Sequence, residues 1–274
     1  MKSQKDKAIA FKFLHDRPGF FIIPNPWDPG TARLLTNAGF EALATTSAGV
    51  AFSLGRPDCN RCLSRDEILD NAKNILAVTE LPVSADLENG YSDSPQGVFD
   101  TILLAGHAGL VGASIEDATG INTDPIYEFK AAVERIRAAA EAKKTFDFPF
   151  ILTARAENFI HGRPDLNDTI CRLQAFQEAG ADVLYAPGLK SRGDISSLVR
   201  SLDKPVNVLT GGALTIAELA EIGVRRISLG SALIRASLGE LLRAASEIKD
   251  KGTWSFADKA IPYDELNEIF NNRD

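Results

Sequence analysis

Residues 83–91 read Val-Ser-Ala-Asp-Leu-Glu-Asn-Gly-Tyr, and the rest of the chain can be interpreted outward from them. The apolar run 81–85 ends in two acids, Asp86 and Glu88, with one residue between them. Because residues i and i+2 of a strand point the same way, both carboxylates are expected on one side of a strand end. Hard oxygen ligands in that position suit Mg²⁺, which takes one or two carboxylates and keeps several waters. The alternative is an acidic loop exposed to solvent.

The same pattern, a short apolar run followed by an amphipathic helix, repeats along most of the chain. Strands are predicted at 20–24, 42–46, 83–86, 112–115, 150–154, 183–186, 206–209 and 226–229. Helices are predicted after them at 29–38, 64–78, 95–108, 125–143, 166–179, 194–202, 215–222 and 231–249. Eight such units favour a closed (β/α)8 barrel of the TIM type. An open, doubly wound sheet is disfavoured, because no GxGxxG turn follows the first strand.

A single domain is expected over residues 1–274, because no low-complexity linker or charge block divides the chain. Residues 252–274 are expected to form a C-terminal helical extension beyond the barrel. The apolar residues of this extension are Trp254, Phe256, Ile261, Tyr263, Leu266, Ile269 and Phe270. They need a surface to pack against, either on the chain's own barrel or on a neighbouring subunit.

The composition argues against several classes of protein. An apolar content of 45% and a charged content of 24% over 274 residues are ordinary for a soluble globular protein. The net charge of −7 argues against a nucleic-acid surface, and no apolar run is long enough to span a membrane. The polar N-terminus resembles no signal peptide, and three cysteines, an odd number, make no disulfide framework. We therefore expect a cytoplasmic protein without nucleic-acid or membrane partners.

The C-terminal ends of the predicted strands carry a set of polar residues where a barrel places its active site. Asp86, Glu88 and Glu116 follow adjacent strands and are candidate metal ligands. Arg155 follows the fifth strand, and its planar fork suits a carboxylate. The alternative for Arg155 is a salt bridge to Glu157 or Asp86. This set predicts a small oxyacid ligand that chelates the ion, which would act as a Lewis acid and stabilise an enolate oxygen.

Two further features bear on this site. Small residues after the second strand, in the run Thr45 to Gly49, would expose backbone N–H groups to an anion. Among the three histidines, His161 follows the fifth strand and is the one that can reach the site. His15 belongs to a polar N-terminal helix and is expected to be exposed.

Four stretches, taken in order and spacing, make the chain resemble the isocitrate lyase/phosphoenolpyruvate mutase superfamily over nearly its whole length. They are Thr46-Ser47-Ala48-Gly49 running on to Leu54-Gly55-Arg56-Pro57-Asp58, then Asp86-Leu87-Glu88-Asn89-Gly90-Tyr91, then Ser114-Ile115-Glu116-Asp117, then Thr153-Ala154-Arg155. The phosphorylmutase-like and 2-methylisocitrate lyase-like members are the ones it resembles. The resemblance implies a barrel whose last helix swaps onto a partner subunit, usually in a dimer of dimers.

The resemblance also implies roles for single residues. Acids matching Asp86, Glu88 and Glu116 bind Mg²⁺ in the family, partly through water, and Mn²⁺ is an expected substitute. Ser47, the backbone at Ala48 and Gly49, and Arg155 would hold the carboxylate of a 2-oxo or 2-hydroxy acid. Asp58 matches an acid close to the reacting centre. Thr45 stands in the substrate site where relatives often have Trp or Tyr.

The loop that follows the fourth strand departs from the family pattern. Residues 117–125 contain no Cys, Lys or His, whereas the isocitrate and methylisocitrate lyases carry a proton-donating Cys there. Asn122 matches an Asn of the mutase loop, but the Lys of that loop has no counterpart. The usual isocitrate lyase and phosphonomutase mechanisms are therefore disfavoured.

The sequence thus predicts a Mg²⁺-dependent lyase or decarboxylase that cleaves a carbon–carbon bond in a small 2-oxo or 2-hydroxy dicarboxylic acid through an enolate. Asp58, Glu157 or His161 would move protons. One alternative is carbon–phosphorus chemistry, as in phosphonopyruvate hydrolysis or phosphonomutation. Another is a 2-oxoacid-binding protein that has lost catalysis.

Overall fold

The computed structural model describes residues 2–58, 62–211 and 214–271. Its centre is a ring of eight parallel strands: β1 (Phe21–Ile23), β2 (Leu43–Ala44), β3 (Val83–Asp86), β4 (Gly112–Glu116), β5 (Ile151–Arg155), β6 (Val183–Tyr185), β7 (Val206–Leu209) and β8 (Arg226–Ser228). They pair in the order β1-β8-β7-β6-β5-β4-β3-β2. Between β1 and β2 the ring is bridged by Ala44, whose N–H donates to the carbonyl of Pro24 at 3.0 Å. The predicted (β/α)8 barrel is confirmed.

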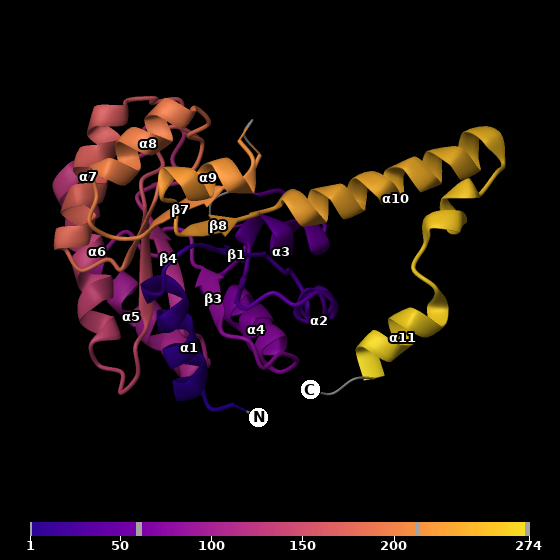
Figure 1. Ribbon diagram of the computed structural model, residues 1–274. Helices are drawn as coiled ribbons and strands as arrows, with labels where there is room; N and C mark the ends of the chain where they lie inside the picture. Colours follow the sequence, from indigo (N-terminus) through magenta and orange to yellow (C-terminus); the bar gives the residue numbers. More distant parts are fainter. Residues whose placement is uncertain (1, 59–61, 212–213, 272–274) are drawn as a thin grey trace.

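Helices surround this ring, as Figure 1 shows. They are α2 (Pro29–Asn37), α3 (Ser47–Ser53), α4 (Arg65–Leu76), α5 (Pro95–His107), α6 (Phe129–Lys143), α7 (Leu166–Glu178), α8 (Arg192–Arg200) and α9 (Ile216–Ile222), whereas α10 (Ala232–Lys251) leaves the ring after β8. The apolar faces of α4 to α9 pack on the outer faces of the strands and form one continuous core. Parallel strands buried on both faces explain why the strand sequences are apolar without strict alternation.

The N-terminal helix α1 (Gln4–Asp16) closes the end of the barrel where the strands begin. Phe11 and Leu14 of α1 pack in one cluster with Phe21, Val111 and Ile151, which lie at or just before strand starts. The last turn of α1 buries His15, which is 6% exposed. The prediction that His15 is exposed is therefore wrong, because helix α1 is a plug for the barrel and not a solvated segment.

Two connections differ from the prediction. Residues 47–53, expected as part of a loop, form α3, and Thr46 caps it by accepting the N–H of Gly49. Helix α6 begins at Phe129 and not at residue 125, because Ala118 and Ile126 form an antiparallel bridge in the preceding loop. The cysteines were expected to make no disulfide framework, but Cys62 is disulfide-bonded. Cys171 is free and exposed on α7, and Cys59 lies outside the described residues.

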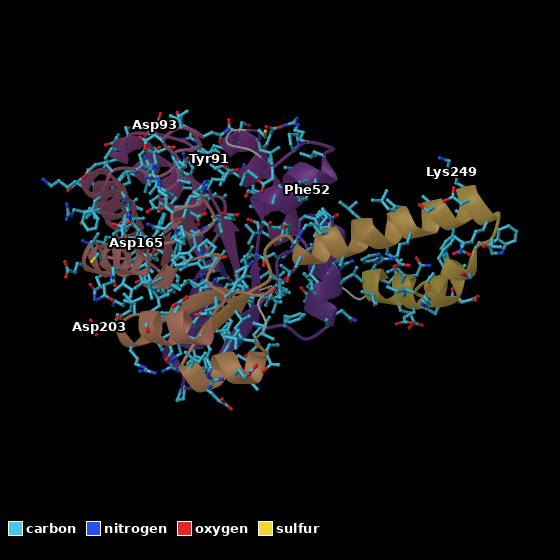
Figure 2. The ribbon with its side chains drawn as sticks, turned by 90° about the horizontal axis from the view of Figure 1, so that it is seen from above. Phe52, Tyr91, Asp93, Asp165, Asp203 and Lys249 are labelled. Atoms are coloured by element: carbon cyan, nitrogen blue, oxygen red, sulfur yellow. The ribbon has the colours of Figure 1, made fainter. Side chains whose placement is uncertain are left out.

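The C-terminal extension begins earlier than the predicted residues 252–274. Helix α10, expected as the eighth helix of the barrel, runs away from it (Figure 1), and Figure 2 shows Lys249 near its far end. A short 3₁₀ helix, η1 (Ser255–Lys259), and helix α11 (Tyr263–Asn271) follow. The chain turns back so that α11 lies against α2, where Arg33 donates to the carbonyl of Phe270. In the part of the chain that the structure describes, no helix is both long and apolar enough to cross a membrane.

Candidate active site

Arg155 stands at the C-terminal end of β5 and is surrounded by carboxylates. Its Nη1 lies 2.9 Å from Oδ1 of Asp86, its Nη2 3.0 Å from Oε2 of Glu116, and its Nε 2.8 Å from Oε1 of Glu157. These acids end or follow β3, β4 and β5, which are neighbours in the ring. The alternative that Arg155 forms salt bridges with Glu157 or Asp86 is therefore confirmed, with Glu116 as a third partner.

We call the end of the barrel where the strands finish its mouth. The acids at this mouth outnumber Arg155, the cation that pairs with them. Burial raises the pKa of Glu116 well above its usual range; Arg155 opposes this shift, and the charges of Glu157 and Asp86 add to it. Burial disfavours the charge on Arg155, but Glu116, Glu157 and Asp86 outweigh that effect and raise its pKa well above the usual value. The mouth therefore carries a surplus of negative charge that a bound cation would relieve.

Asp86 is held in place by hydrogen bonds from two neighbouring strands and from α3. Its Oδ2 accepts the Ser47 hydroxyl at 3.0 Å and the Ser47 N–H at 3.3 Å, and its Oδ1 accepts the Ser114 hydroxyl at 3.3 Å. Its own N–H donates to Oγ1 of Thr45 at 3.0 Å. Thr45 and Ser47, predicted to bind substrate, thus both orient a candidate metal ligand.

The mouth contains two adjoining cavities of about 220 Å³ each. Four residues line both of them: Ser47, Asp58, Arg155 and Ile160. The outer cavity is further lined by Glu88, Glu116, Glu157 and His161. The inner cavity runs from Asp86 down into the barrel and includes Ala48. Partial burial and the charge of Asp86 raise the pKa of Asp58, which suits a group that holds a proton beside both cavities.

Glu157 is positioned by a second buried ion pair behind the mouth. Its N–H donates to Oδ1 of Asp117 at 2.8 Å, and Nη1 of Arg172 lies 3.2 Å from Oδ2 of the same carboxylate. Burial raises the pKa of Asp117 to about 7. Asp117 was not among the predicted site residues. The available signal was its place directly after Glu116 at a strand end.

Not every predicted residue lies where the sequence placed it. Strand β3 ends at Asp86, and Glu88 follows with a left-handed φ of 47°, so strand alternation does not position its carboxylate. The N–H of Gly49 is occupied by Thr46, and Gly49 lines neither cavity. Asn122 is exposed at the tip of the loop after β4 and also lines neither cavity.

The acids do not form a ready-made metal cage. Among the described residues, no three His, Cys, Asp or Glu side chains are grouped so that they could hold an ion directly. Their chemistry nevertheless fits Mg²⁺, which binds hard carboxylate oxygens and is satisfied by one or two of them with waters in the remaining positions. The three carboxylates that surround the single guanidinium of Arg155 are the observation that supports this fit.

Comparison with known proteins identifies the class. A family model described as phosphoenolpyruvate phosphomutase matches residues 11–249, so the chain belongs to that family. The fold, the acids at the strand ends and this match together make the protein an enzyme of the isocitrate lyase/phosphoenolpyruvate mutase type.

Individual relatives carry several different enzyme names. The chain is 27% identical to a probable 2-methylisocitrate lyase of Corynebacterium glutamicum, with 89% of this chain and 82% of that one covered. It is 28% identical to an oxaloacetate decarboxylase of Pseudomonas putida, with 86% and 82% covered. A structure from Burkholderia cenocepacia, provisionally described as a lyase/mutase, is 55% identical, with a TM-score of 0.96 and 99% and 98% covered. A phosphonopyruvate hydrolase complex with oxalate and Mg²⁺ is 26% identical, with a TM-score of 0.86 and 97% and 95% covered.

Proposed function

We propose that this protein is a Mg²⁺-dependent lyase or decarboxylase that cleaves a carbon–carbon bond in a small 2-oxo or 2-hydroxy dicarboxylic acid. The observation that carries the proposal is the surplus of carboxylates around Arg155, three of which contact its guanidinium. Two relatives support it, since one is named as an oxaloacetate decarboxylase and another as a probable 2-methylisocitrate lyase.

Asp86, Glu88 and Glu116 would hold the ion, with Mn²⁺ as an expected substitute. When bound, the ion supplies Lewis-acid stabilisation of the negative charge that develops on the 2-oxygen as the carbon–carbon bond breaks. Ser47 keeps the Asp86 carboxylate in one orientation through its hydrogen bond, and Thr45 accepts the backbone N–H of Asp86. A structure of a relative that contains Mg²⁺ with oxalate, a two-carbon oxyacid, supports the same kind of site here.

Arg155 would bind the substrate carboxylate once the ion shares the acids that now surround it. Protons would be moved by Asp58, which lines both cavities and whose pKa is raised by desolvation and by the charge of Asp86. Glu157 and His161 line the outer cavity and are the other two candidates. Glu157 is 1% exposed and fixed by Arg155 and Asp117, so its carboxylate is well placed to keep one orientation during the reaction.

Carbon–phosphorus chemistry is the second candidate, because one structural relative is a phosphonopyruvate hydrolase. A substrate panel separates the two: oxaloacetate, methylisocitrate, dimethylmalate, isocitrate and phosphonopyruvate, followed by proton and phosphorus NMR with Mg²⁺ and with chelator. We expect Mg²⁺-dependent loss of a carbon acid. Phosphate release would favour the phosphonate reaction. Oxalate binding that needs Mg²⁺, without any turnover, would favour a binding protein.

The ion site is tested separately from turnover by calorimetric titration of oxalate. Replacing Glu88 with Gln removes one candidate ligand charge and is expected to weaken oxalate binding in Mg²⁺ by about tenfold or more. Glu134→Gln is the matched control, because Glu134 is an exposed acid on α6 that pairs with Arg137. Equal oxalate affinities for the wild type and Glu88→Gln would remove Glu88 from the ligand set.

We also propose that the enzyme is a homo-oligomer, built as a dimer of dimers, in which the C-terminal helices pack on a partner subunit. Leu238, Leu241, Leu242 and Ile248 lie on one side of α10 and are all exposed in the single chain. An apolar stripe of this length on a helix that leaves the barrel is typical of a protein interface.

A further inference from the structure

A second buried arginine lies inside the barrel, below the mouth. Arg226 is the first residue of β8 and is 6% exposed. Its Nε donates to Oδ1 of Asn207 at 2.8 Å and its Nη2 to Oγ1 of Thr153 at 2.9 Å, and its Nη1 lies 3.4 Å from Nε2 of His15. Within the described ranges of the chain, no acidic side chain forms an ion pair with it.

The charge of Arg226 is therefore solvated only by neutral groups. Burial lowers the pKa of Arg226 to about 10, and the hydroxyl of Tyr185 opposes that shift only in part. Arg155, in the same barrel, is compensated by three carboxylates. A buried cation without a counter-ion is costly, and an anion bound beside it would remove much of that cost.

Arg226 also retains donors for such an anion. An arginine side chain has five N–H donors, of which three are used in the contacts with Asn207, Thr153 and His15. One N–H on each terminal nitrogen is left, and two donors on a planar fork match the two oxygens of a carboxylate.

The inner cavity connects this guanidinium with the candidate chemical centre. Asp86, Thr153, Arg155 and Arg226 all line it. Asp86 and Arg155 are the last residues of β3 and β5, whereas Arg226 is the first residue of β8 and its Nη2 donates to Thr153, so the cavity extends from the strand ends toward the strand starts. Thr153 precedes Arg155 by two residues on β5, which corresponds to about 6–7 Å along a strand. The side chains that line the cavity near this level are neutral and polar, among them Ser84, Asn207 and Ser228. Ser114 also lines the cavity, but its hydroxyl donates to Asp86. The lower cavity therefore offers a cation and hydrogen-bonding groups without a competing acid.

We propose that Arg226 binds the distal carboxylate of the substrate inside the barrel, and that this contact selects dicarboxylic over monocarboxylic acids. The inference rests on the proposed function for the identity of the ligand and extends it to substrate specificity. The 2-oxyacid end lies at the mouth with Asp86 and Arg155, and the chain of the substrate points down the inner cavity. Arg226 is a specificity residue in this arrangement and takes no part in bond cleavage.

The test compares acids that differ by the distal carboxylate: lactate with malate, and 2-oxobutyrate with 2-oxoglutarate. Calorimetric titrations use the whole protein in Mg²⁺ and again in chelator, with oxalate as a probe too short to reach Arg226. We expect the wild type to bind the dicarboxylate of at least one pair about 10- to 100-fold more tightly than its partner. Arg226→Gln should abolish that preference and leave oxalate affinity within about twofold.

Two further variants separate recognition from a structural role. Arg226→Lys keeps the charge without the fork, so it should retain part of the preference, and it serves in place of Arg226→Gln if that variant fails to fold. His107→Gln changes an exposed histidine at the end of α5 that does not contact Arg226, and should leave the preference unchanged. Thermal melts of all variants check that the fold is intact.

The inference is overturned if Arg226→Gln keeps the dicarboxylate preference, if the wild type shows none while it binds oxalate, or if Arg226→Gln weakens oxalate and dicarboxylates equally. If oxalate does not bind to the wild type in Mg²⁺, the proposed ion site fails. In that case the inner carboxylate site is still supported if the wild type prefers malate over lactate in chelator and Arg226→Gln loses that preference. If the wild type shows no such preference in chelator, the inner site is overturned as well.

Discussion

Two arginines in one barrel, Arg155 and Arg226, meet opposite electrostatic surroundings. The guanidinium of Arg155 is shared by three carboxylates at the strand ends, which suits a site that gains a cation. Arg226 is held by an amide, a hydroxyl and an imidazole, which suits a site that gains an anion. The two environments lie in one cavity, so a ligand that carries a chelating end and a second carboxylate satisfies both.

The imidazole of His15 gives a prediction for stability against pH. Phe11 accepts a hydrogen bond from Nδ1 at 2.8 Å, and Nε2 faces the N–H groups of Arg226, so the ring is neutral. Burial and the charge of Arg226 lower the pKa of His15 to about 3. The unfolded chain therefore binds more protons between pH 3 and 6.5, and stability falls as the pH falls through that window.

His15→Gln should remove this contribution. The difference in unfolding free energy between pH 7 and pH 5, measured by urea denaturation, is expected to be smaller than in the wild type by about 2 kcal/mol. His107→Gln is the control, because His107 is an exposed histidine at the end of α5. If His15→Gln keeps the pH dependence of the wild type, the neutral, buried imidazole is not its source.

At the scale of elements, α3 couples the second strand to the candidate metal site. Its first residue, Ser47, donates two hydrogen bonds to the Asp86 carboxylate. Thr46 caps the helix, because its hydroxyl oxygen accepts the N–H of Gly49. A Cβ at Gly49 would lie 2.4 Å from Cγ2 of Thr46 and 3.2 Å from Cβ of Trp27. Gly49 is thus needed for close packing of the first turn of α3, and this role differs from the predicted contact with substrate.

Gly49→Ala should therefore shift α3 and disturb Asp86. We expect a loss of about 1–3 kcal/mol in unfolding free energy from overpacking and a roughly tenfold weaker binding of oxalate in Mg²⁺. Gly193→Ala on α8 is the matched control, since its Cβ would meet nothing closer than Oγ of Ser191 at 3.9 Å. Oxalate affinity equal to that of the wild type in Gly49→Ala would show that α3 does not set the geometry of Asp86.

At the scale of the whole molecule, the barrel and its extension differ in how they bury apolar residues. The barrel encloses its core between strands and helices. The extension leaves Leu241 63%, Leu242 68% and Trp254 70% exposed, and among its described helices only α11 returns to the barrel, against α2 (Figure 1). Apolar side chains exposed to this extent on one long helix favour association with a second copy of the chain.

The double variant Leu241→Glu/Leu242→Glu should reduce the mass of the particle, because two charges would enter the apolar stripe of α10. Sedimentation velocity is expected to show an oligomer for the wild type and a smaller species for the variant. Ala236→Glu, an exposed position on the other side of α10, should leave the mass unchanged. A wild-type protein that sediments as a monomer would contradict the proposed assembly.

Local sequence patterns determined the barrel and much of the site. The alternation of short apolar runs and amphipathic helices depends on spacing within each segment, so all eight strands could be predicted to within a few residues. The ends of parallel strands must meet at one face of a barrel, so Asp86, Glu116 and Arg155 could be predicted as neighbours.

Other features were decided only by the tertiary structure. Glu88 reaches the mouth through a left-handed backbone conformation and not through strand alternation. Asp117 lies behind the mouth, where its carboxylate accepts the backbone N–H of Glu157. Nothing near His15 in the sequence indicates its burial against Arg226, because the two residues are 211 positions apart. Local periodicity reports which face of an element is buried. Which charge meets which partner depends on contacts between distant segments, and these exist only once the barrel has closed.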